Sequence, residues 1–268
     1  MSEPILSIEN LCIKSDRSLI RNLSMSVHEG EIVGLIGESG SGKSLSARAV
    51  LDLLPKGVNM ESGSIHYFGQ NLSKLGKRKR RSLAGSEMAM IFQDYRGSFT
   101  PYIKMGKQMI EAIRSHQKMS KKEAKERVLR ALEEMNLSPE RIFSSYPFQL
   151  SGGQVQRAAI ATVRLLTPSL ILCDEVTTAL DVISGEIVMD DLEKTCKETG
   201  SALLLITHDL SEAFRRADRI YVMHKGEIVE QGPTDKIKEY PSHPYTKKLF
   251  SSLLSLPVNV EAERRRVL

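Results

Sequence analysis

A glycine-rich loop near the beginning of the chain has the composition of a phosphate-binding site. Residues 37–44 read Gly-Glu-Ser-Gly-Ser-Gly-Lys-Ser and fit the pattern G-x-x-x-x-G-K-[ST]. In this pattern backbone N–H groups wrap the phosphates of a nucleotide, the lysine reaches the β and γ oxygens, and the next hydroxyl binds Mg²⁺. We therefore assign Lys43 to the phosphates and Ser44 to the metal. The remaining residues of the predicted nucleotide site are Gly37, Glu38, Ser39, Gly40, Ser41 and Gly42.

A second glycine-rich segment, at residues 151–154, precedes a stretch with few helix breakers, residues 155–166. Glycines at the start of a helix let backbone amides approach an anion closely, and the helix dipole favours negative charge there. The chain already has one phosphate site, so we expect the second one to act on a nucleotide held by a partner subunit. The residues of this predicted site are Ser151, Gly152, Gly153 and Gln154.

Two carboxylates follow the apolar segment at residues 170–173. Asp174 suits the coordination of Mg²⁺, directly or through water, as nucleotide-hydrolysing proteins with this kind of loop require. Glu175, one residue further, can polarise a water molecule in line with the γ-phosphate and act as the general base. Alone, such a pair would also fit a charged turn after a buried strand, but the loop at 37–44 favours the catalytic interpretation.

The pattern of apolar residues gives the loop at 37–44 the structural context that it needs. Residues 32–36 form an apolar strand that leads into the loop, and a helix is expected from Lys43 to about Leu54, ended by Pro55 and Gly57. A strand, a glycine-rich turn and a helix in this order add the positive end of the helix dipole to the phosphate site.

The remaining pattern predicts an α/β fold with a β-rich part and a helical part. Strands that alternate with helices in the second half imply a parallel sheet with right-handed crossovers. Ser120 and Glu123 form a capping box at the start of a helix in the helical part. We expect a single domain, 1–268, with a helical subdomain at about 95–150 and a C-terminal tail at about 235–268. The expected strands are 5–13, 23–36 (broken by a turn at 28–31), 63–69, 87–92, 170–173, 202–206 and 219–223, and the later helices are 184–198 and 210–217.

Composition indicates an ordinary globular protein, since 41% of the residues are hydrophobic and 26% are charged. The net charge of +5 fits a protein that binds nucleic acid, an anionic membrane surface or triphosphates. The densest basic run, residues 77–81, is predicted to be a solvated loop before the strand at 88–92; a nucleic-acid patch is the alternative.

Neither a membrane span nor export is expected from the sequence. The longest apolar run, residues 202–206, falls far short of the roughly 18 residues that a bilayer requires. The segment Met-Ser-Glu-Pro at residues 1–4 lacks a basic region followed by an apolar one. The cysteines Cys12, Cys173 and Cys196 show no C-x-x-C pairing, which fits a reducing cytosol, and we expect Cys12 and Cys173 in the core.

Residues 147–157, Pro-Phe-Gln-Leu-Ser-Gly-Gly-Gln-Val-Gln-Arg, resemble the signature motif of ABC-transporter ATPases. The other hallmarks of that family match in order along nearly the whole chain. The resemblance implies that Gln93 contacts Mg²⁺ or the attacking water, that Asp181 belongs to the D-loop, and that His208 is the switch histidine at the γ-phosphate. It also implies the fold of a P-loop NTPase of the ABC cassette type: a RecA-like parallel-sheet core, an antiparallel β subdomain and an inserted helical subdomain.

Within this family, residues 240–249 resemble the tail motif of the oligopeptide, dipeptide and nickel importer ATPases. The chain ends at Leu268 without the cysteine-bearing extension of many peptide importers, which favours the nickel or metallophore branch. Two positions depart from the family pattern. Ser15 stands where an aromatic ring usually stacks on adenine, so we expect weaker ATP affinity or base selectivity, and Val176 replaces the usual proline, with a small expected effect.

The resemblance implies a cytosolic ATPase subunit of a bacterial ABC importer, bound to the cytoplasmic face of the membrane. Its implied partners are a second, related ATPase in a heterodimer, two transmembrane permeases and an extracytoplasmic substrate-binding protein, with ATP and Mg²⁺ as ligands. Nickel, a metal–metallophore complex and short peptides all fit as cargo. Two alternatives remain: a soluble ABC-type ATPase acting on DNA or ribosomes, and a nucleotide switch with little turnover, against which Glu175 argues.

Overall fold

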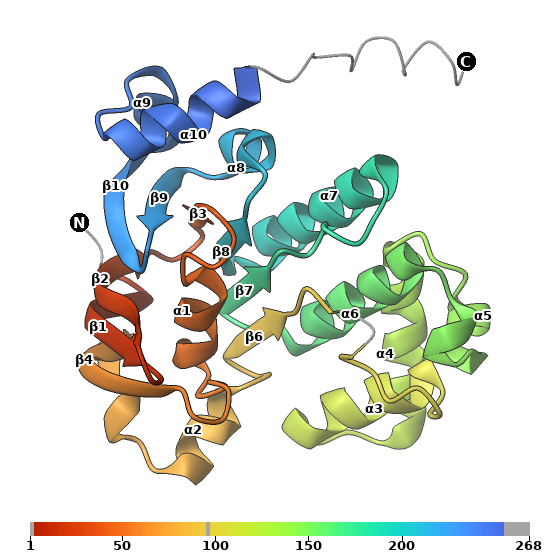
Figure 1. The fold of residues 1–268 in the computed structure, drawn as a ribbon. Helices are drawn as coiled ribbons and strands as arrows, with labels where there is room; N and C mark the ends of the chain where they lie inside the picture. The colour runs from red at the N-terminus through yellow and green to blue at the C-terminus, as the bar shows by residue number, and fades with distance from the viewer. Residues whose placement is uncertain (1–2, 95–96, 255–268) are drawn as a thin grey trace.

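A computed structural model describes residues 3–94 and 97–254, and its centre is a six-stranded sheet (Figure 1). Neighbouring strands follow the order β10-β9-β3-β8-β7-β6, and all are parallel except β10, which pairs antiparallel with β9. The parallel sheet expected from the sequence is therefore confirmed, and the antiparallel edge strand β10 is an addition to it. The strands are β3 (Ile32–Ile36), β6 (Met88–Ile91), β7 (Leu170–Asp174), β8 (Ala202–Thr207), β9 (Arg219–His224) and β10 (Glu227–Pro233).

Both faces of this sheet are buried, which explains why its strands are apolar throughout. Successive side chains of a strand point to opposite faces. In β8, Leu204 and Ile206 therefore pack into one hydrophobic core, while Leu203 and Leu205 pack into the other. A continuous apolar segment is typical of a parallel strand covered on both sides.

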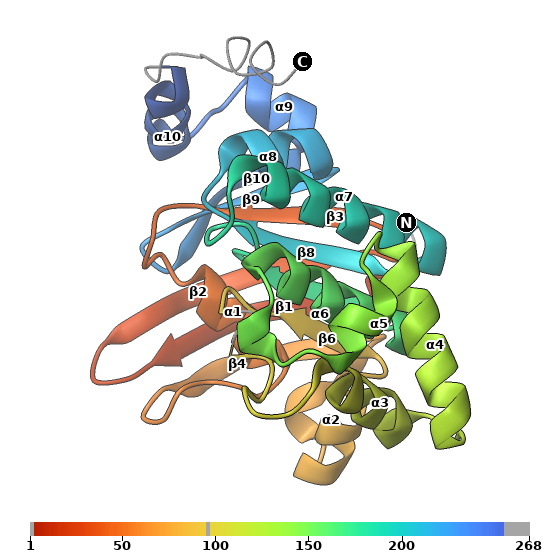
Figure 2. The ribbon, with the colours of Figure 1, turned by 90° about the vertical axis from the view of Figure 1, so that its right-hand side faces the viewer.

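Helices cover both faces of the sheet (Figures 1 and 2). The helix α1 and the N-terminal strands share one core with β3, β7 and β8, whereas α6, α7 and α8 lie in the core on the other face. The helices α3, α4 and α5 extend the second core and form the inserted helical subdomain. These helices are α1 (Lys43–Val50), α3 (Met105–His116), α4 (Lys121–Glu134), α5 (Pro139–Ser144), α6 (Gly152–Leu166), α7 (Val182–Thr199) and α8 (Leu210–Arg216).

A second, antiparallel sheet of four strands in the order β2-β1-β4-β5 completes the first core. The fold class expected from the sequence is thus confirmed: a parallel-sheet core, an antiparallel sheet and inserted helices. The exact subdomain boundaries remain a prediction, and residues 255–268 of the expected tail lie outside the described residues. The strands are β1 (Leu6–Lys14), β2 (Ser18–Val27), β4 (Asn59–Tyr67) and β5 (Gln70–Asn71), and a 3₁₀ turn follows at Leu72–Lys74.

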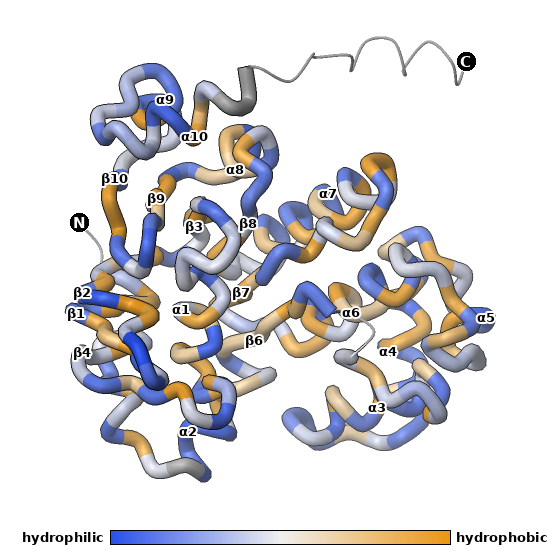
Figure 3. The backbone as a smooth tube through the Cα atoms, viewed as in Figure 1, coloured by the Kyte–Doolittle hydropathy of each residue, from blue (hydrophilic) through white to orange (hydrophobic). Residues whose placement is uncertain are grey.

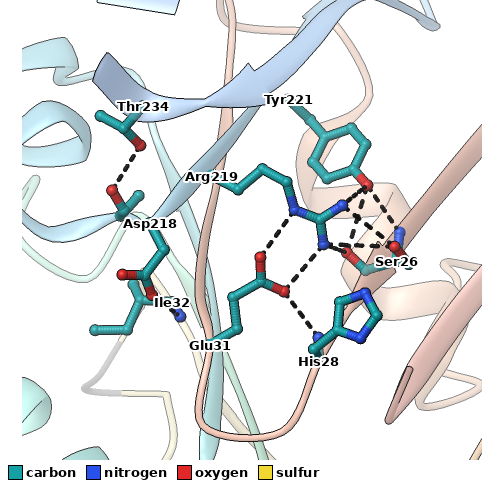
Figure 4. Close-up of polar contacts among 9 residues, drawn as sticks. Ser26, His28, Glu31, Ile32, Asp218, Arg219, Tyr221 and Thr234 are labelled. Atoms are coloured by element: carbon teal, nitrogen blue, oxygen red, sulfur yellow. Dashed lines mark hydrogen bonds and ion pairs between the residues drawn. The ribbon is translucent and has the colours of Figure 1, made fainter. Parts of the chain in front are cut away.

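A polar network joins the two sheets where β2 turns into β3 (Figure 4). The guanidinium of Arg219 on β9 donates to both carboxylate oxygens of Glu31, at 2.8 and 3.0 Å, and to the backbone oxygen of Ser26 on β2 at 2.8 Å. The phenol oxygen of Tyr221 accepts from the backbone N–H of Ser26 at 3.1 Å. Beside it, Asp218 accepts from the backbone N–H of Ile32 at 2.9 Å. The network fixes the point at which β3 enters the central sheet.

The last part of the described chain, residues 234–254, lies over the β9–β10 end of the sheet. The helices α9 (Thr234–Glu239) and α10 (Pro244–Leu254) lie beyond β10, at the top of Figure 1. The rings of Phe214 on α8 and Phe250 on α10 meet edge to face with centroids 5.0 Å apart. Within the tail motif at residues 240–249, Tyr245 belongs to the core and Leu249 packs against it, whereas Tyr240 is exposed.

Three local expectations were wrong. Cys12, expected in the core, is only partly buried, because its neighbours Leu11 and Ile13 occupy the core face of β1. The helix α1 ends at Val50, not near Leu54, because Asp52 adopts a positive φ of 61° and the backbone N–H of Leu53 turns back to the oxygen of Arg48 at 2.8 Å. The basic run at 77–81 is not a solvated loop: it lies in the helix α2 (Lys77–Leu83), which is hydrophilic in Figure 3.

The helix α2 has a structural reason to form. Arg80 is largely buried and donates to the backbone oxygens of Ala49 at 2.7 Å and Val50 at 3.4 Å, which lie at the end of α1. Carbonyls at a helix C-terminus lack partners within the helix and favour a positive charge. The side chains of Arg78, Lys79 and Arg81 are exposed. Within residues 3–94 and 97–254, no helix combines the length and hydrophobicity that crossing a bilayer requires.

The packing between α1 and the two sheets predicts the stability of a core variant. Replacing the fully buried Leu204 by alanine should lower the free energy of unfolding by about 2–5 kcal/mol, because a cavity remains in the core. Urea unfolding followed by circular dichroism measures this change. The same replacement at Leu53, which is 47% exposed, should change it by less than about 0.5 kcal/mol. Equal effects at the two positions would contradict the packing described here.

Candidate active site

The parallel strands of the central sheet bring the predicted site residues to one edge. The strands β3, β8, β7 and β6 are neighbours in this order, and their carboxyl ends lie at the same edge because they are parallel. Ligands in sheets of this kind bind outside the carboxyl ends of the strands. The loop at 37–44 follows β3, His208 follows β8, Glu175 follows β7 and Gln93 lies two residues beyond β6.

The glycine-rich loop between β3 and α1 is tightly packed. A Cβ atom at Gly37 would lie 2.1 Å from the backbone oxygen of Met223, and one at Gly42, whose φ is +111°, would lie 2.8 Å from the Met223 side chain. Only glycine fits such close approaches of the backbone. The backbone N–H of Gly226 also donates to the oxygen of Ser41 at 2.9 Å. The turn between β9 and β10 therefore contacts the glycine-rich loop and restrains its backbone.

Lys43 points into this loop. Its ammonium donates to the backbone oxygens of Gly37 at 2.8 Å and Glu38 at 3.0 Å and lies 4.0 Å from a carboxylate oxygen of Glu175. The side chain is only 3% exposed. Burial lowers the pKa of Lys43, and the charges of Glu175 and Asp174 oppose this shift. The charge thus lies in a poorly solvated place, where an added anionic phosphate would be strongly attracted.

Ser44 and Asp174 form a direct contact across the site. The hydroxyl of Ser44 donates to a carboxylate oxygen of Asp174 at 2.6 Å. Burial raises the pKa of Asp174, and the hydrogen bond from Ser44 and the charge of Arg48 counteract the increase. The structure thus brings together the hydroxyl and the carboxylate that the sequence predicted to share a metal ion.

Glu175 contacts side chains from three other segments. One of its carboxylate oxygens lies 3.3 Å from the amide nitrogen of Gln93, 3.3 Å from Nδ1 of His208 and 3.4 Å from the hydroxyl of Thr178. The other oxygen faces Lys43. Thr178 had not been expected in the site, and no spacing signal in the sequence distinguishes it from other threonines.

The backbone of Glu175 is strained. Its φ is +48°, in the left-handed region that residues with a side chain rarely adopt. The backbone N–H donates to the oxygen of Ile206 at 2.9 Å, which holds this conformation against β8. Strained backbone of this kind is concentrated at functional sites. The next residue, Val176, is 2% exposed and packs in the core. The expectation that valine in place of the usual proline has a small effect stays a prediction.

The second glycine-rich segment lies apart from the first. Among the described residues, no hydrogen bond or ion pair joins residues 151–154 to residues 37–44. Ser151 caps α6: its hydroxyl accepts from the backbone N–H of Gln154 at 3.3 Å, and the Gln154 side chain accepts from the N–H of Ser151 at 3.0 Å. Gly152 and Gly153 form the first turn of the helix, as the sequence predicted.

Asp181 also caps a helix rather than contacting Glu175 or His208. Its carboxylate accepts from the backbone N–H of Ser184 at 2.9 Å and from the Ser184 hydroxyl at 2.6 Å, at the start of α7. The hydrogen bonds to Ser184 lower the pKa of Asp181. A Cβ at Gly153 would lie 3.5 Å from that of Ser184, so the segment at 151–154 and the Asp181–Ser184 cap lie next to each other and form a second polar region.

One residue of the tail contacts the loop at 37–44. Tyr245 of the tail accepts a hydrogen bond from the backbone N–H of Glu38 at 3.0 Å; the sequence identified the tail motif but gave no role to this residue. Ser15 lies in the turn between β1 and β2 and donates to Asp16 at 2.5 Å. The expectation that Ser15 weakens ATP binding stays a prediction.

Comparisons with known proteins agree with this geometry. The family model described as ABC transporter matches residues 20–178. The chain is 39% identical over 248 residues to the nickel import system ATP-binding protein NikD of Staphylococcus aureus strain MRSA252, over 92% of this chain and 95% of that protein. It is 38% identical over 253 residues to the probable D,D-dipeptide transport ATP-binding protein DdpD of Escherichia coli strain K12, over 92% of this chain and 77% of that protein.

Solved structures share the fold. The dimeric ATP-binding cassette MJ0796, in a post-hydrolysis state bound to ADP and Pi, has a TM-score of 0.76 and 27% identity, over 85% of this chain and 98% of that one. The protein cbiO1 from Clostridium perfringens, part of the ABC transporter complex cbiONQ, has a TM-score of 0.75 over 99% of this chain and 100% of its own length, at 22% identity. The matched family model, the two relatives and the arrangement around Lys43 and Glu175 lead to one conclusion: this chain belongs to the ABC transporter family and is one of its ATP-binding, ATP-hydrolysing subunits.

Proposed function

We propose that this chain is the ATPase subunit of an ABC importer for nickel, a metal–metallophore complex or short peptides. The observation that carries the proposal is the position of Glu175, which contacts Lys43, Gln93 and His208 at once. The named relatives, a nickel import protein and a dipeptide transport protein, support import over an ATPase acting on DNA or ribosomes.

The residues at the edge of the sheet have separate roles in binding and hydrolysing ATP. The ammonium of Lys43 and those backbone amides of residues 37–44 that do not already donate within the protein bind the phosphates. Glu175 accepts the proton of the attacking water. Gln93 and Thr178 orient the glutamate through hydrogen bonds to one oxygen, which leaves the other oxygen toward Lys43 and the phosphates. His208 contacts the γ-phosphate and reports its presence. Gln93 connects the water and the metal to the partner in the membrane.

The site fits a magnesium ion. The hydroxyl of Ser44 and the carboxylate of Asp174, 2.6 Å apart, are the hard oxygen ligands that Mg²⁺ prefers, and Gln93 is a further candidate. Mg²⁺ commonly takes one or two protein ligands together with water and substrate phosphates. Accordingly, the described residues hold no group of three or more His, Cys, Asp or Glu suited to a metal. Bound Mg²⁺ neutralises the charge that develops on the phosphates.

The separation of the two glycine-rich segments supports a dimer. We propose that residues 151–154 and Asp181 act on the ATP held by residues 37–44 of a second, related ATPase subunit. The side chains of Val182 and Ile183, next to Asp181, are 78% and 68% exposed, so an apolar surface is available beside the second polar region. Closure of the two subunits on ATP would drive two separate permease subunits, and hydrolysis would reset them.

Isolation of the complex tests the importer. The tagged chain is purified from gently solubilised membranes, and its partners are identified by mass spectrometry. Two polytopic permeases and a second ATPase are expected, and a co-isolated extracytoplasmic binding protein would narrow the cargo and place the chain at the cytoplasmic face of the membrane. Recovery with DNA or ribosomes would refute import and leave only the ATPase chemistry.

Removing the proposed base should separate binding from hydrolysis. Glu175→Gln keeps the shape of the side chain, so ATP binding should persist while steady-state hydrolysis falls by about 10²- to 10⁴-fold. Binding is measured with a fluorescent ATP analogue and hydrolysis by phosphate release. Glu29→Gln, an identical change at an exposed turn residue, should leave both values unchanged. Undiminished turnover in Glu175→Gln would exclude Glu175 as the base.

Removing the buried ammonium should weaken nucleotide binding itself. Lys43→Ala deletes a charged donor, so the Kd for ATP should rise by about 10- to 100-fold. The control is Lys56→Ala, because Lys56 is an exposed lysine beyond the end of α1. An unchanged Kd in Lys43→Ala would contradict the assignment of residues 37–44 as the phosphate site.

A further inference from the structure

The tail motif at residues 240–249 reaches back to the loop at 37–44. The phenol oxygen of Tyr245, near the start of α10, accepts a hydrogen bond from the backbone N–H of Glu38 at 3.0 Å. Tyr245 is 9% exposed, so this bond is largely shielded from water. The tail therefore supplies a side chain to the loop that is proposed to bind the phosphates, from a part of the chain that the ABC transporter family model does not match.

Several contacts hold Tyr245 in this position. Its ring stacks on that of His224, the last residue of β9, with centroids 3.8 Å apart. Its backbone N–H donates to Nδ1 of His243 at 3.2 Å. The carboxylate of Glu230 on β10 accepts from the backbone N–H groups of Ser242 at 2.6 Å and His243 at 3.1 Å. The turn before α10 is therefore fixed to the sheet, and the phenol is oriented before any ligand binds.

The same peptide segment of the loop is held on both sides. The N–H of Glu38 donates to Tyr245, and the backbone oxygen of Glu38 accepts from the ammonium of Lys43 at 3.0 Å. A phosphate in the loop would compete for that ammonium. When Lys43 turns toward the phosphate, the contact with Tyr245 still holds this residue of the loop, together with the close packing of Gly37 on Met223.

We propose that Tyr245 is a positioning residue of the ATP site, and that the tail motif serves to keep the phosphate-binding loop in its binding conformation. The inference rests on the proposed role of residues 37–44. Without the phenol, the free loop can turn the N–H of Glu38 to water, and ATP binding has to reverse that change. Affinity should fall, while the chemical step should not, because Tyr245 makes no hydrogen bond or ion pair with Glu175.

The test removes one oxygen atom. Tyr245→Phe keeps the ring on His224 and should raise the Kd of the full chain for ATP by about tenfold. In the intact transporter complex it should raise the KM for ATP by a similar factor and change kcat by less than about twofold. The matched control is Tyr240→Phe, because Tyr240 lies in the same motif but is 78% exposed; its Kd should equal that of the unaltered chain.

Two further variants separate the possible outcomes. Phe250→Leu loosens α10 against Phe214 without altering the phenol. It should therefore lower the thermal unfolding temperature while leaving the Kd for ATP close to that of the unaltered chain. If Phe250→Leu weakens ATP binding as much as Tyr245→Phe, the tail acts through general stability and the inference is overturned. A normal Kd in Tyr245→Phe also overturns it. If Lys43→Ala binds ATP normally as well, the assignment of the loop itself fails instead.

Discussion

The parallel alignment of β3, β8, β7 and β6 is the constraint on which the site depends. Each strand contributes one short segment just beyond its carboxyl end, and adjacent parallel strands place these ends about 4.8 Å apart. Residues that are distant in sequence, such as Lys43 and His208, thereby come within reach of one carboxylate. The sheet can hold this alignment because both its faces are covered by apolar packing.

Glu175 shows how this arrangement concentrates function in one residue. It is held in a left-handed conformation by β8, and its two oxygens face different partners. Buried charges usually need several partners to be tolerated, and here those partners come from separate loops. Any movement of the segments that carry Gln93 or His208 therefore changes the contacts of the same carboxylate. Under the proposed roles of Gln93 toward the membrane partner and of His208 toward the γ-phosphate, both signals reach the carboxylate of Glu175.

Much of this organisation could be predicted from the sequence, and the exceptions have physical reasons. The loop at 37–44 and the carboxylates at the end of β7 are local patterns in the sequence, so both could be recognised from it. Arg80 was expected in water because a run of like charges usually is, yet the free carbonyls at the end of α1 attract it. The contact between Tyr245 and Glu38 joins residues far apart in the chain, and no local pattern encodes such a pairing. The positive φ of Glu175 could not be predicted from the sequence either, since glutamate rarely adopts this conformation.

The position of β3 in the centre of the sheet has a consequence for biosynthesis. Its two neighbours are β8 and β9, which the ribosome makes long after residues 32–36 have emerged, and Tyr245 follows later still. Pairings between such distant segments form slowly. The nascent chain therefore carries the apolar strand β3 without its sheet neighbours until residues 202–224 have been made. A subunit truncated before β9 would lack the backbone of Met223 on which Gly37 packs, so its loop at 37–44 would lose this support.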